Sequence, residues 1–298
     1  MKQLVNKKGE TIPHIGLGTY PFEGRVMADM VKTAVNVGYR LFDTADDYRG
    51  EPGIGIAVRE LENEGVKREE LFLQTQISDN NAHEDEPLKG IYFNPTSDFM
   101  HRHTVAELVR EKVATSLRDM NTDYIDSLLI HYPFPNYIVD IWKTMIEMKE
   151  EGIVRYIGVS NFHERHIEQL ISSTGVTPDI NEVYVSPIGI KKDLVDYCDS
   201  HDILVMPYSP LMDVAHGKIS EERLRPIMEK YNKSLAQVVL RWNIERGCFP
   251  LPKTKNPSRL KENFNVFDFS LTEDEVDIIS SLNYDNQYLV ESKICPGL

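Results

Sequence analysis

The chain of 298 residues has few cysteines, no long hydrophobic run and far fewer basic than acidic residues. Its three cysteines, Cys198, Cys248 and Cys295, are widely separated and form no C-x-x-C or cysteine–histidine cluster, so neither a disulfide framework nor a zinc site is expected. The apolar runs are shorter than the ~20 residues of a membrane helix, which predicts no membrane span. The N-terminal stretch lacks the apolar segment of a signal peptide, and we expect a cytoplasmic protein.

The charge balance limits the kind of partner. A formal net charge of −14 opposes binding to nucleic acid or to an anionic membrane through long-range repulsion. A small molecule is therefore the expected partner, and any phosphate on it needs a local basic patch. The composition does not indicate an oligomeric state. A hydrophobic content of 41% and a charged content of 27% are ordinary for a globular protein, and we expect one domain over residues 1–298.

Strand-like runs alternate with amphipathic helical stretches, as in βαβ units. This alternation predicts an α/β protein, a (β/α)8 TIM barrel with an N-terminal β-hairpin and an extra C-terminal helix. The runner-up is a doubly wound open sheet, which is disfavoured because GLGTY (16–20) opens no glycine-rich phosphate loop. The expected strands lie near 15–18, 39–43, 71–75, 126–131, 154–159, 180–184, 203–207 and 248–251. The expected helices lie near 26–37, 53–64, 104–119, 138–150, 164–172, 191–200, 220–231, 257–263 and 273–282.

Three polar side chains follow buried strands. Asp43 and Tyr48 lie in GYRLFDTADDY (38–48), and His131 ends IDSLLIHYP (125–133). The carboxyl ends of parallel barrel strands meet at one rim, where barrel enzymes keep their chemistry. A phenol and an imidazole at that rim can deliver a proton to a carbonyl oxygen and orient it. Each residue alone is more often structural, but together they predict an active site.

These residues together resemble the aldo-keto reductases. The resemblance implies a catalytic tetrad in which Tyr48 is the general acid, His131 orients the substrate oxygen, and Asp43 acts with a lysine at the end of the third strand. In LFLQTQIS (71–78) the lysine position is held by Gln76, which we count as the fourth catalytic position. The implied cofactor is NADPH, which supplies a hydride, while the protein supplies the proton.

The resemblance also implies cofactor contacts at later strand ends. In GVSNF (158–162), Ser160 and Asn161 would bind the nicotinamide carboxamide. Glu182, in INEVYVSP, stands where the family usually has an amide, a second departure from the family pattern. In YSPL (208–211), Tyr208 would stack on the nicotinamide, with Ser209 and Leu211 as further cofactor contacts.

The segment LPKTKNPSRLKENF (251–264) is the basic patch that an acidic protein needs for a phosphate. By the same resemblance Lys253 and Arg259 hold the 2′-phosphate of NADPH, and a nearby helix N-terminus adds to this site. Thr254 is a further phosphate donor, while Asn263 and Glu262 lie at the adenine.

A neutral Gln76 changes the expected chemistry. Without an adjacent ammonium the Tyr48 phenol should have a pKa near its ordinary value of about 10. Carbonyl reduction needs the protonated phenol and should persist at a lower rate, whereas alcohol oxidation needs the phenolate and should suffer more. Asp43 also loses a cation, so it should be protonated or should recruit another donor.

Two functions remain open. The first is an NADPH-dependent reduction of an aldehyde or ketone to an alcohol. The alternative is an NADPH-binding protein with little ordinary turnover, acting as a sensor or running another reaction in the same pocket. The long polar segment 78–103 is expected to border the pocket mouth, with Tyr92, Phe93 or Phe99 contacting substrate.

Overall fold

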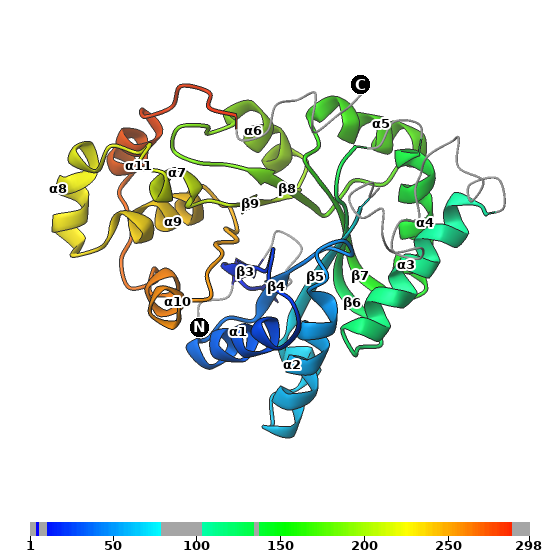
Figure 1. Ribbon diagram of the computed structural model, residues 1–298. Helices are drawn as coiled ribbons and strands as arrows, with labels where there is room; N and C mark the ends of the chain where they lie inside the picture. Colours follow the sequence, from blue (N-terminus) through cyan, green and yellow to red (C-terminus); the bar gives the residue numbers. More distant parts are fainter. Residues whose placement is uncertain (1–3, 6–10, 79–102, 134–136, 288–298) are drawn as a thin grey trace.

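The computed structural model describes residues 4–5, 11–78, 103–133 and 137–287. Seven strands run parallel in chain order from β3 to β9, and helices surround them (Figure 1). An open doubly wound sheet would reverse its strand order, so that alternative is wrong. The strands are β3 (Gly16–Gly18), β4 (Leu41–Asp43), β5 (Phe72–Ile77), β6 (Ile125–Ile130), β7 (Val154–Ser160), β8 (Ile180–Tyr184) and β9 (Leu204–Tyr208).

The predicted eighth strand is present as a hydrogen-bonded segment that closes the barrel. On one side Phe249 N donates to Val205 O of β9 at 2.9 Å, and Leu251 N donates to Pro207 O at 2.9 Å. On the other side the amide nitrogens of Gly16 and Gly18 in β3 donate to the carbonyl oxygens of residues 250 and 252 at 3.1 and 3.2 Å. The barrel interior is therefore bounded on all sides by backbone.

The helices follow the expected amphipathic patterns. In α4 the residues Ile138, Ile141, Trp142, Met145 and Met148 are all buried on one face, as their spacing predicts. The helices are α1 (Gly24–Val37), α2 (Glu51–Asn63), α3 (Val105–Asp119), α4 (Ile138–Glu150), α5 (Glu164–Thr174), α6 (Lys192–Ser200), α7 (Met212–Ala215), α8 (Glu221–Tyr231), α9 (Leu235–Glu245), α10 (Pro257–Phe264) and α11 (Glu273–Ser280), with a short 3-10 helix η1 (Arg68–Glu70).

One substantial helix, α9, is absent from the sequence prediction. Its signal is present in the chain, because Ser234 caps it and the Gln237 side chain bonds back to the cap. The predicted hairpin is confirmed, with β1 (Leu4–Val5) antiparallel to β2 (Thr11–Ile12). The predicted extra C-terminal helix is α11, which opens with a capping box formed by Thr272 and Glu275.

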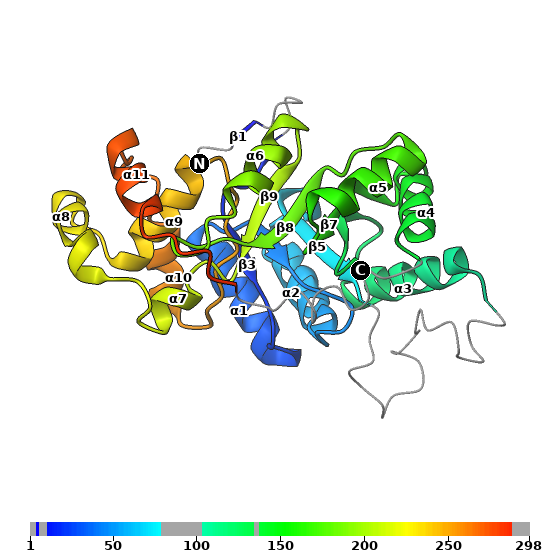
Figure 2. The same ribbon diagram turned by 90° about the horizontal axis from the view of Figure 1, so that it is seen from above.

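The barrel interior has an apolar lower layer. Ile12 of the hairpin packs with Leu41, Phe72 and Ile180, which lie toward the starts of their strands, so the hairpin closes the N-terminal end (Figure 2). Polar side chains begin further along the strands, as at Asp43, which ends β4 and lies toward the C-terminal end of the barrel. The polar part of the barrel interior therefore lies toward the C-terminal rim.

Outside the barrel wall, helix α2 begins with a buried carboxyl group. Glu51 accepts a hydrogen bond from Thr75 Oγ1 of β5 at 2.7 Å and is 4% exposed. Burial, and secondarily the nearby Asp46 carboxylate, raises the pKa of Glu51 to about 7. This group therefore binds a proton more tightly in the folded chain than in the unfolded one.

No helix in the described part of the chain is long and apolar enough to cross a bilayer. Among the same residues, no group of three or more His, Cys, Asp or Glu side chains could hold a metal ion. Cys198 and Cys248 are unpaired and buried, and Cys295 lies outside the described residues.

The raised pKa of Glu51 gives a prediction about stability. A folded pKa above the unfolded one stabilises the fold below about pH 4.5, and this contribution is lost as the pH rises through about 7. Glu51→Gln keeps the shape and cannot ionise. As the pH rises from about 4.5 to about 8, the unfolding free energy of Glu51→Gln should therefore increase relative to that of wild type by up to ~3 kcal/mol. Urea unfolding at both pH values measures this gain, and parallel pH dependence in the two proteins would contradict it.

Candidate active site

A pocket with a cavity volume of about 340 Å³ opens at the C-terminal rim of the barrel. Loops and strand ends from β3 round to the closing segment form its walls. It contains nine of the residues that the sequence predicts for catalysis or cofactor binding. These are Asp43, Tyr48, His131, Ser160, Asn161, Glu182, Tyr208, Ser209 and Lys253.

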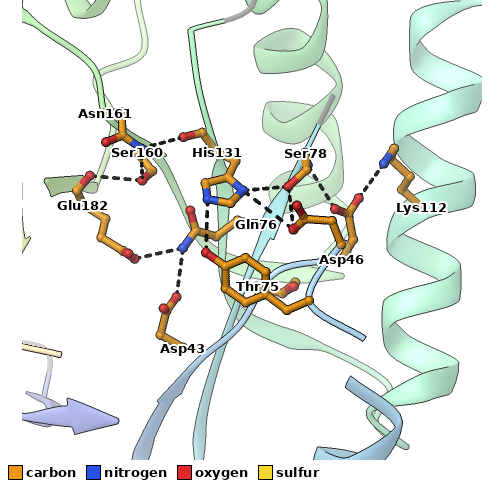
Figure 3. Close-up of polar contacts among 12 residues, drawn as sticks. Asp43, Asp46, Thr75, Gln76, Ser78, Lys112, His131, Ser160, Asn161 and Glu182 are labelled. Carbon is orange, nitrogen blue, oxygen red and sulfur yellow. Dashed lines mark hydrogen bonds and ion pairs between the residues drawn. The ribbon is translucent and has the colours of Figure 1, made fainter. Parts of the chain in front are cut away.

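Tyr48 and His131 meet in this pocket from the ends of two different strands. The Tyr48 hydroxyl lies 3.3 Å from His131 Nε2, and the two rings are edge to face. On the far side of the imidazole, Nδ1 lies 2.6 Å from Ser78 Oγ (Figure 3). The imidazole is therefore held between a phenol and a serine hydroxyl.

The hydrogen bonds around Ser78 decide which nitrogen of His131 carries the proton. Ser78 Oγ donates to Asp47 Oδ1 at 3.0 Å, so its one proton is committed to that carboxylate. The contact with the imidazole must then use a proton on His131 Nδ1. Nε2 is left as an acceptor for the Tyr48 hydroxyl. In this tautomer His131 cannot donate through Nε2, which differs from the orienting donor expected from the family resemblance.

The protonation states fit this arrangement. Burial lowers the pKa of His131 to about 4, so the imidazole is neutral at neutral pH. Burial, followed by the nearby carboxyl groups of Asp43 and Glu182, raises the pKa of Tyr48 well above its ordinary value. The expectation of a pKa near 10 is therefore wrong, because it considered only the missing cation and not the burial of the phenol or the surrounding carboxyl groups.

Below the phenol, four buried side chains form a ring that we call the amide–carboxyl ring: Asp43, Gln74, Gln76 and Glu182. Gln76 Nε2 donates to Asp43 Oδ1 and to Glu182 Oε2, at 3.1 Å in both cases (Figure 3). Gln74 Nε2 donates to the same two oxygens at 3.0 and 2.8 Å. Asp43 thus recruits other donors, as expected.

Gln74 was missed in the sequence. Residues two apart on a strand share a face, so Gln74 and Gln76 had to point into the barrel together. The spacing was the available signal.

A second set of polar contacts links the pocket to α3. Lys112 Nζ lies 2.6 Å from Asp46 Oδ2, and Asp46 Oδ1 accepts from the Ser78 backbone nitrogen at 3.1 Å (Figure 3). These contacts fix Ser78 against His131. Ser78 opens the long segment predicted to border the pocket, whereas residues 79–102, with Tyr92, Phe93 and Phe99, lie outside the described residues.

Beyond His131, the end of β7 is held by its own network. Asn161 Nδ2 donates to the His131 backbone oxygen at 3.0 Å, and Tyr208 Oη donates to Asn161 Oδ1 at 2.9 Å. Ser160 Oγ donates to the Glu182 backbone oxygen at 3.1 Å. Asn161 has a left-handed backbone, with φ of 62°, which asparagine tolerates better than most residues. The predicted Asn161 and Tyr208 are therefore brought together.

The C-terminal basic patch adjoins this pocket through Lys253, an exposed residue on its wall. Arg259 is exposed in the first turn of α10, whereas Asn263 is buried in the same helix. Neither Lys253 nor Arg259 pairs with a carboxylate within the described part of the chain. Unpaired cations on a protein of net charge −14 suit a phosphate. Thr254 precedes α10, Glu262 lies within it, and Leu211 directly precedes α7; none of the three lines the pocket.

The helix N-terminus in this patch is already occupied. Asn256 Oδ1 accepts from the backbone nitrogens of Ser258 and Arg259 at 2.9 and 3.4 Å. The Thr254 hydroxyl in turn accepts from Asn256 N at 3.1 Å. The charge for a phosphate therefore comes from side chains, and the contribution expected from the helix N-terminus is not available in this arrangement.

Comparison with known proteins gives a consistent picture. Residues 14–284 match the model of the Aldo/keto reductase family. The chain is 36% identical to methylglyoxal reductase DkgA of Escherichia coli O157:H7 over 277 residues, 92% of this chain and 91% of that one. It is 35% identical to glyoxal reductase of Bacillus subtilis over 281 residues, 94% of this chain and 92% of that one.

Solved structures agree with these relatives. An aldo/keto reductase of Brucella melitensis superposes with a TM-score of 0.80 at 33% identity, covering 94% of this chain and 99% of that one. A Bombyx mori aldo-keto reductase solved with NADP superposes with a TM-score of 0.82 at 31% identity, covering 98% and 96%. The chain belongs to the aldo/keto reductase family.

Proposed function

We propose that this protein is an NADP-dependent oxidoreductase that reduces small aldehydes or ketones to alcohols. The observation that carries the proposal is the Tyr48–His131 pair in a pocket at the barrel rim. Membership of the aldo/keto reductase family, and the similarity to relatives named for methylglyoxal and glyoxal reduction, support a small carbonyl substrate. A substrate of that size suits a cavity of about 340 Å³.

The cofactor, when bound, supplies the hydride. Ser160, Asn161 and Tyr208 line the inner wall of the pocket and would hold its nicotinamide end. Lys253 and Arg259, with Thr254, would hold the 2′-phosphate, and Asn263 and Glu262, both on α10, would contact the adenine. The unpaired cations of this patch are the feature that fits the extra phosphate.

Tyr48 would supply the proton. Its raised pKa keeps the phenol protonated across the neutral range, which is the form that a developing alkoxide needs. With the His131 proton on Nδ1, the Tyr48 hydroxyl would donate to His131 Nε2, 3.3 Å away. A substrate carbonyl would take the place of Nε2 as its acceptor, while Ser78 keeps the imidazole in position.

The alternative, a cofactor-binding protein with little turnover, draws on one observation. The third-strand position that would hold a lysine holds Gln76, so no side-chain ammonium there polarises the phenol. A protein that only binds the cofactor has no need for the Tyr48 phenol and the His131 imidazole to lie in contact beside buried carboxyl groups. We therefore favour reduction, with a moderate rate.

The cofactor assignment predicts that NADPH binds more tightly than NADH. Lys253→Ala and Arg259→Ala should each weaken NADPH by ~1.5–3 kcal/mol, because each removes a charge-assisted contact with the 2′-phosphate, and should leave NADH almost unchanged. Fluorescence titration of both nucleotides measures this. Lys255→Ala is the matched control, since Lys255 is an exposed neighbouring cation that lies over the Phe22 ring. Equal dissociation constants for the two nucleotides in wild type would refute the assignment.

The neutral residue at position 76 gives a prediction about rate. Gln76→Lys should raise kcat for reduction of methylglyoxal by ~10- to 100-fold, because an ammonium beside the phenol, unlike a proton held on buried carboxyl groups, can stabilise the developing phenolate directly, by ~1.4–2.7 kcal/mol. It should raise kcat for oxidation of the alcohol product by a larger factor, because that direction draws on the phenolate.

Steady-state assays in both directions test this prediction, with Gln76→Met as a neutral control and Tyr48→Phe to remove the acid. Gln76→Met should not reproduce the gain. If Gln76→Lys changes nothing and Tyr48→Phe retains native activity, the pocket performs some other chemistry.

A further inference from the structure

The amide–carboxyl ring has an unusual composition for the interior of a barrel. It holds two carboxyl groups, Asp43 and Glu182, which are 5% and 3% exposed. One oxygen of each accepts from both amide nitrogens, at distances from 2.8 to 3.1 Å. Because the same two donors hold both oxygens, the two carboxyl groups are drawn together across the ring.

The orientation of the amides shows what the carboxyl oxygens require. The Oε1 atoms of Gln74 and Gln76 are both buried and have no hydrogen-bond partner. A buried carbonyl oxygen without a partner costs free energy, so these amides keep their nitrogens on the carboxyl groups at the expense of their oxygens. The ring is therefore organised to stabilise negative charge with neutral donors.

Neutral donors cannot cancel two full charges in this position. The other ionisable groups that line this pocket are Tyr20, Asp47, Tyr48, His131, Tyr132, Tyr208 and Lys253. Of these, only Lys253 carries a positive charge at neutral pH, and it is exposed at the outer wall. Beneath the ring lie Leu41, Phe72 and Ile180, which are apolar. Within the described residues, no lysine or arginine forms an ion pair with Asp43 or Glu182.

We propose that Asp43 and Glu182 share a single proton, so that the pair carries one negative charge and the proton takes the place of a side-chain cation. Two carboxyl groups held this close cannot both ionise without strong repulsion. Burial first, and then the neighbouring Asp43 charge, raises the pKa of Glu182 well above its ordinary value, and burial also raises the pKa of Asp43. Glu182 thereby acts on the phenol through the charge of the pair and not through a direct contact.

The shared proton has a consequence that rests on the proposed reductase function. When it is lost at high pH, the pair gains a second negative charge beside Tyr48. This charge opposes the alkoxide that forms on a reduced carbonyl, so kcat for reduction should fall by ~10-fold per pH unit above that ionisation, with little change in KM. In Glu182→Gln the remaining carboxylate has no partner to share a proton, so this alkaline fall should be absent.

Infrared spectroscopy of the protein without cofactor or substrate tests the pair itself. A protonated carboxyl group gives a C=O stretching band that shifts in D2O. The comparison is made in the Glu51→Gln background, which removes another buried carboxyl of raised pKa. We expect a band at neutral pH that disappears in both Glu182→Gln and Asp43→Asn, because a single proton belongs to both groups. A spectrum that neither substitution changes would overturn the proposal.

Gln76→Lys gives the most specific infrared test, because it adds a cation while keeping both carboxyl groups. If a cation and the shared proton are interchangeable, the new ammonium should displace the proton, and the acid band should vanish at neutral pH. The neutral Gln76→Met should keep it. Persistence of the band in folded Gln76→Lys would contradict the proposal.

Stability against pH provides a second measurement if a substitution at Asp43 or Glu182 prevents folding. The raised folded pKa values mean that wild type loses stability as the pH rises through them, and Gln76→Lys should flatten that loss. If the unfolding free energies of wild type and Gln76→Lys fell equally steeply with rising pH, the shared proton would be contradicted. The infrared and unfolding measurements do not require catalytic turnover. A protein that has the acid band but no reductase activity would refute the proposed function and support the shared proton. An active reductase without the band would refute the shared proton and support the proposed function.

Discussion

Two neutral amides hold two buried carboxyl groups together inside the barrel, and the chemistry available to the pocket depends on this contact. Gln74 and Gln76 each donate to Asp43 and Glu182, directly below the phenol of Tyr48. The ring brings negative rather than positive charge to the phenol. Because burial and these carboxyl groups raise the pKa of Tyr48, the phenol is suited to give a proton and poorly suited to take one.

The barrel makes this contact possible. β4, β5 and β8 are far apart in the sequence, but closure of the sheet points their side chains into one interior. The hairpin and the apolar layer close the other end, so the polar groups meet only at the C-terminal rim. His131, fixed by Ser78 and Asn161, completes the same layer from β6 and its loop.

Much of this arrangement follows from the sequence. The eight-strand count, the hairpin and the meeting of Tyr48 with His131 were predictable, because hydrophobic alternation and strand-end position are local signals. The raised pKa of Tyr48 was not predictable, since it depends first on the burial of the phenol in the assembled barrel and then on the carboxyl groups of Asp43 and Glu182 that the fold brings to it. The tautomer of His131 depends on a serine that carries no signal of its own. Helix α9 is missing from the sequence prediction although its capping box, Ser234 with Gln237, is present in the sequence.

The most direct test of the account is an ultraviolet titration of the Tyr48 phenol, taken as the difference between wild type and Tyr48→Phe. The account holds that this phenol stays protonated wherever the protein could reduce a carbonyl. It predicts no tyrosinate signal from Tyr48 at about pH 10, where an ordinary tyrosine is half ionised. A difference signal that titrates at or below about pH 10 would show that the phenol readily becomes a base, and would contradict the account.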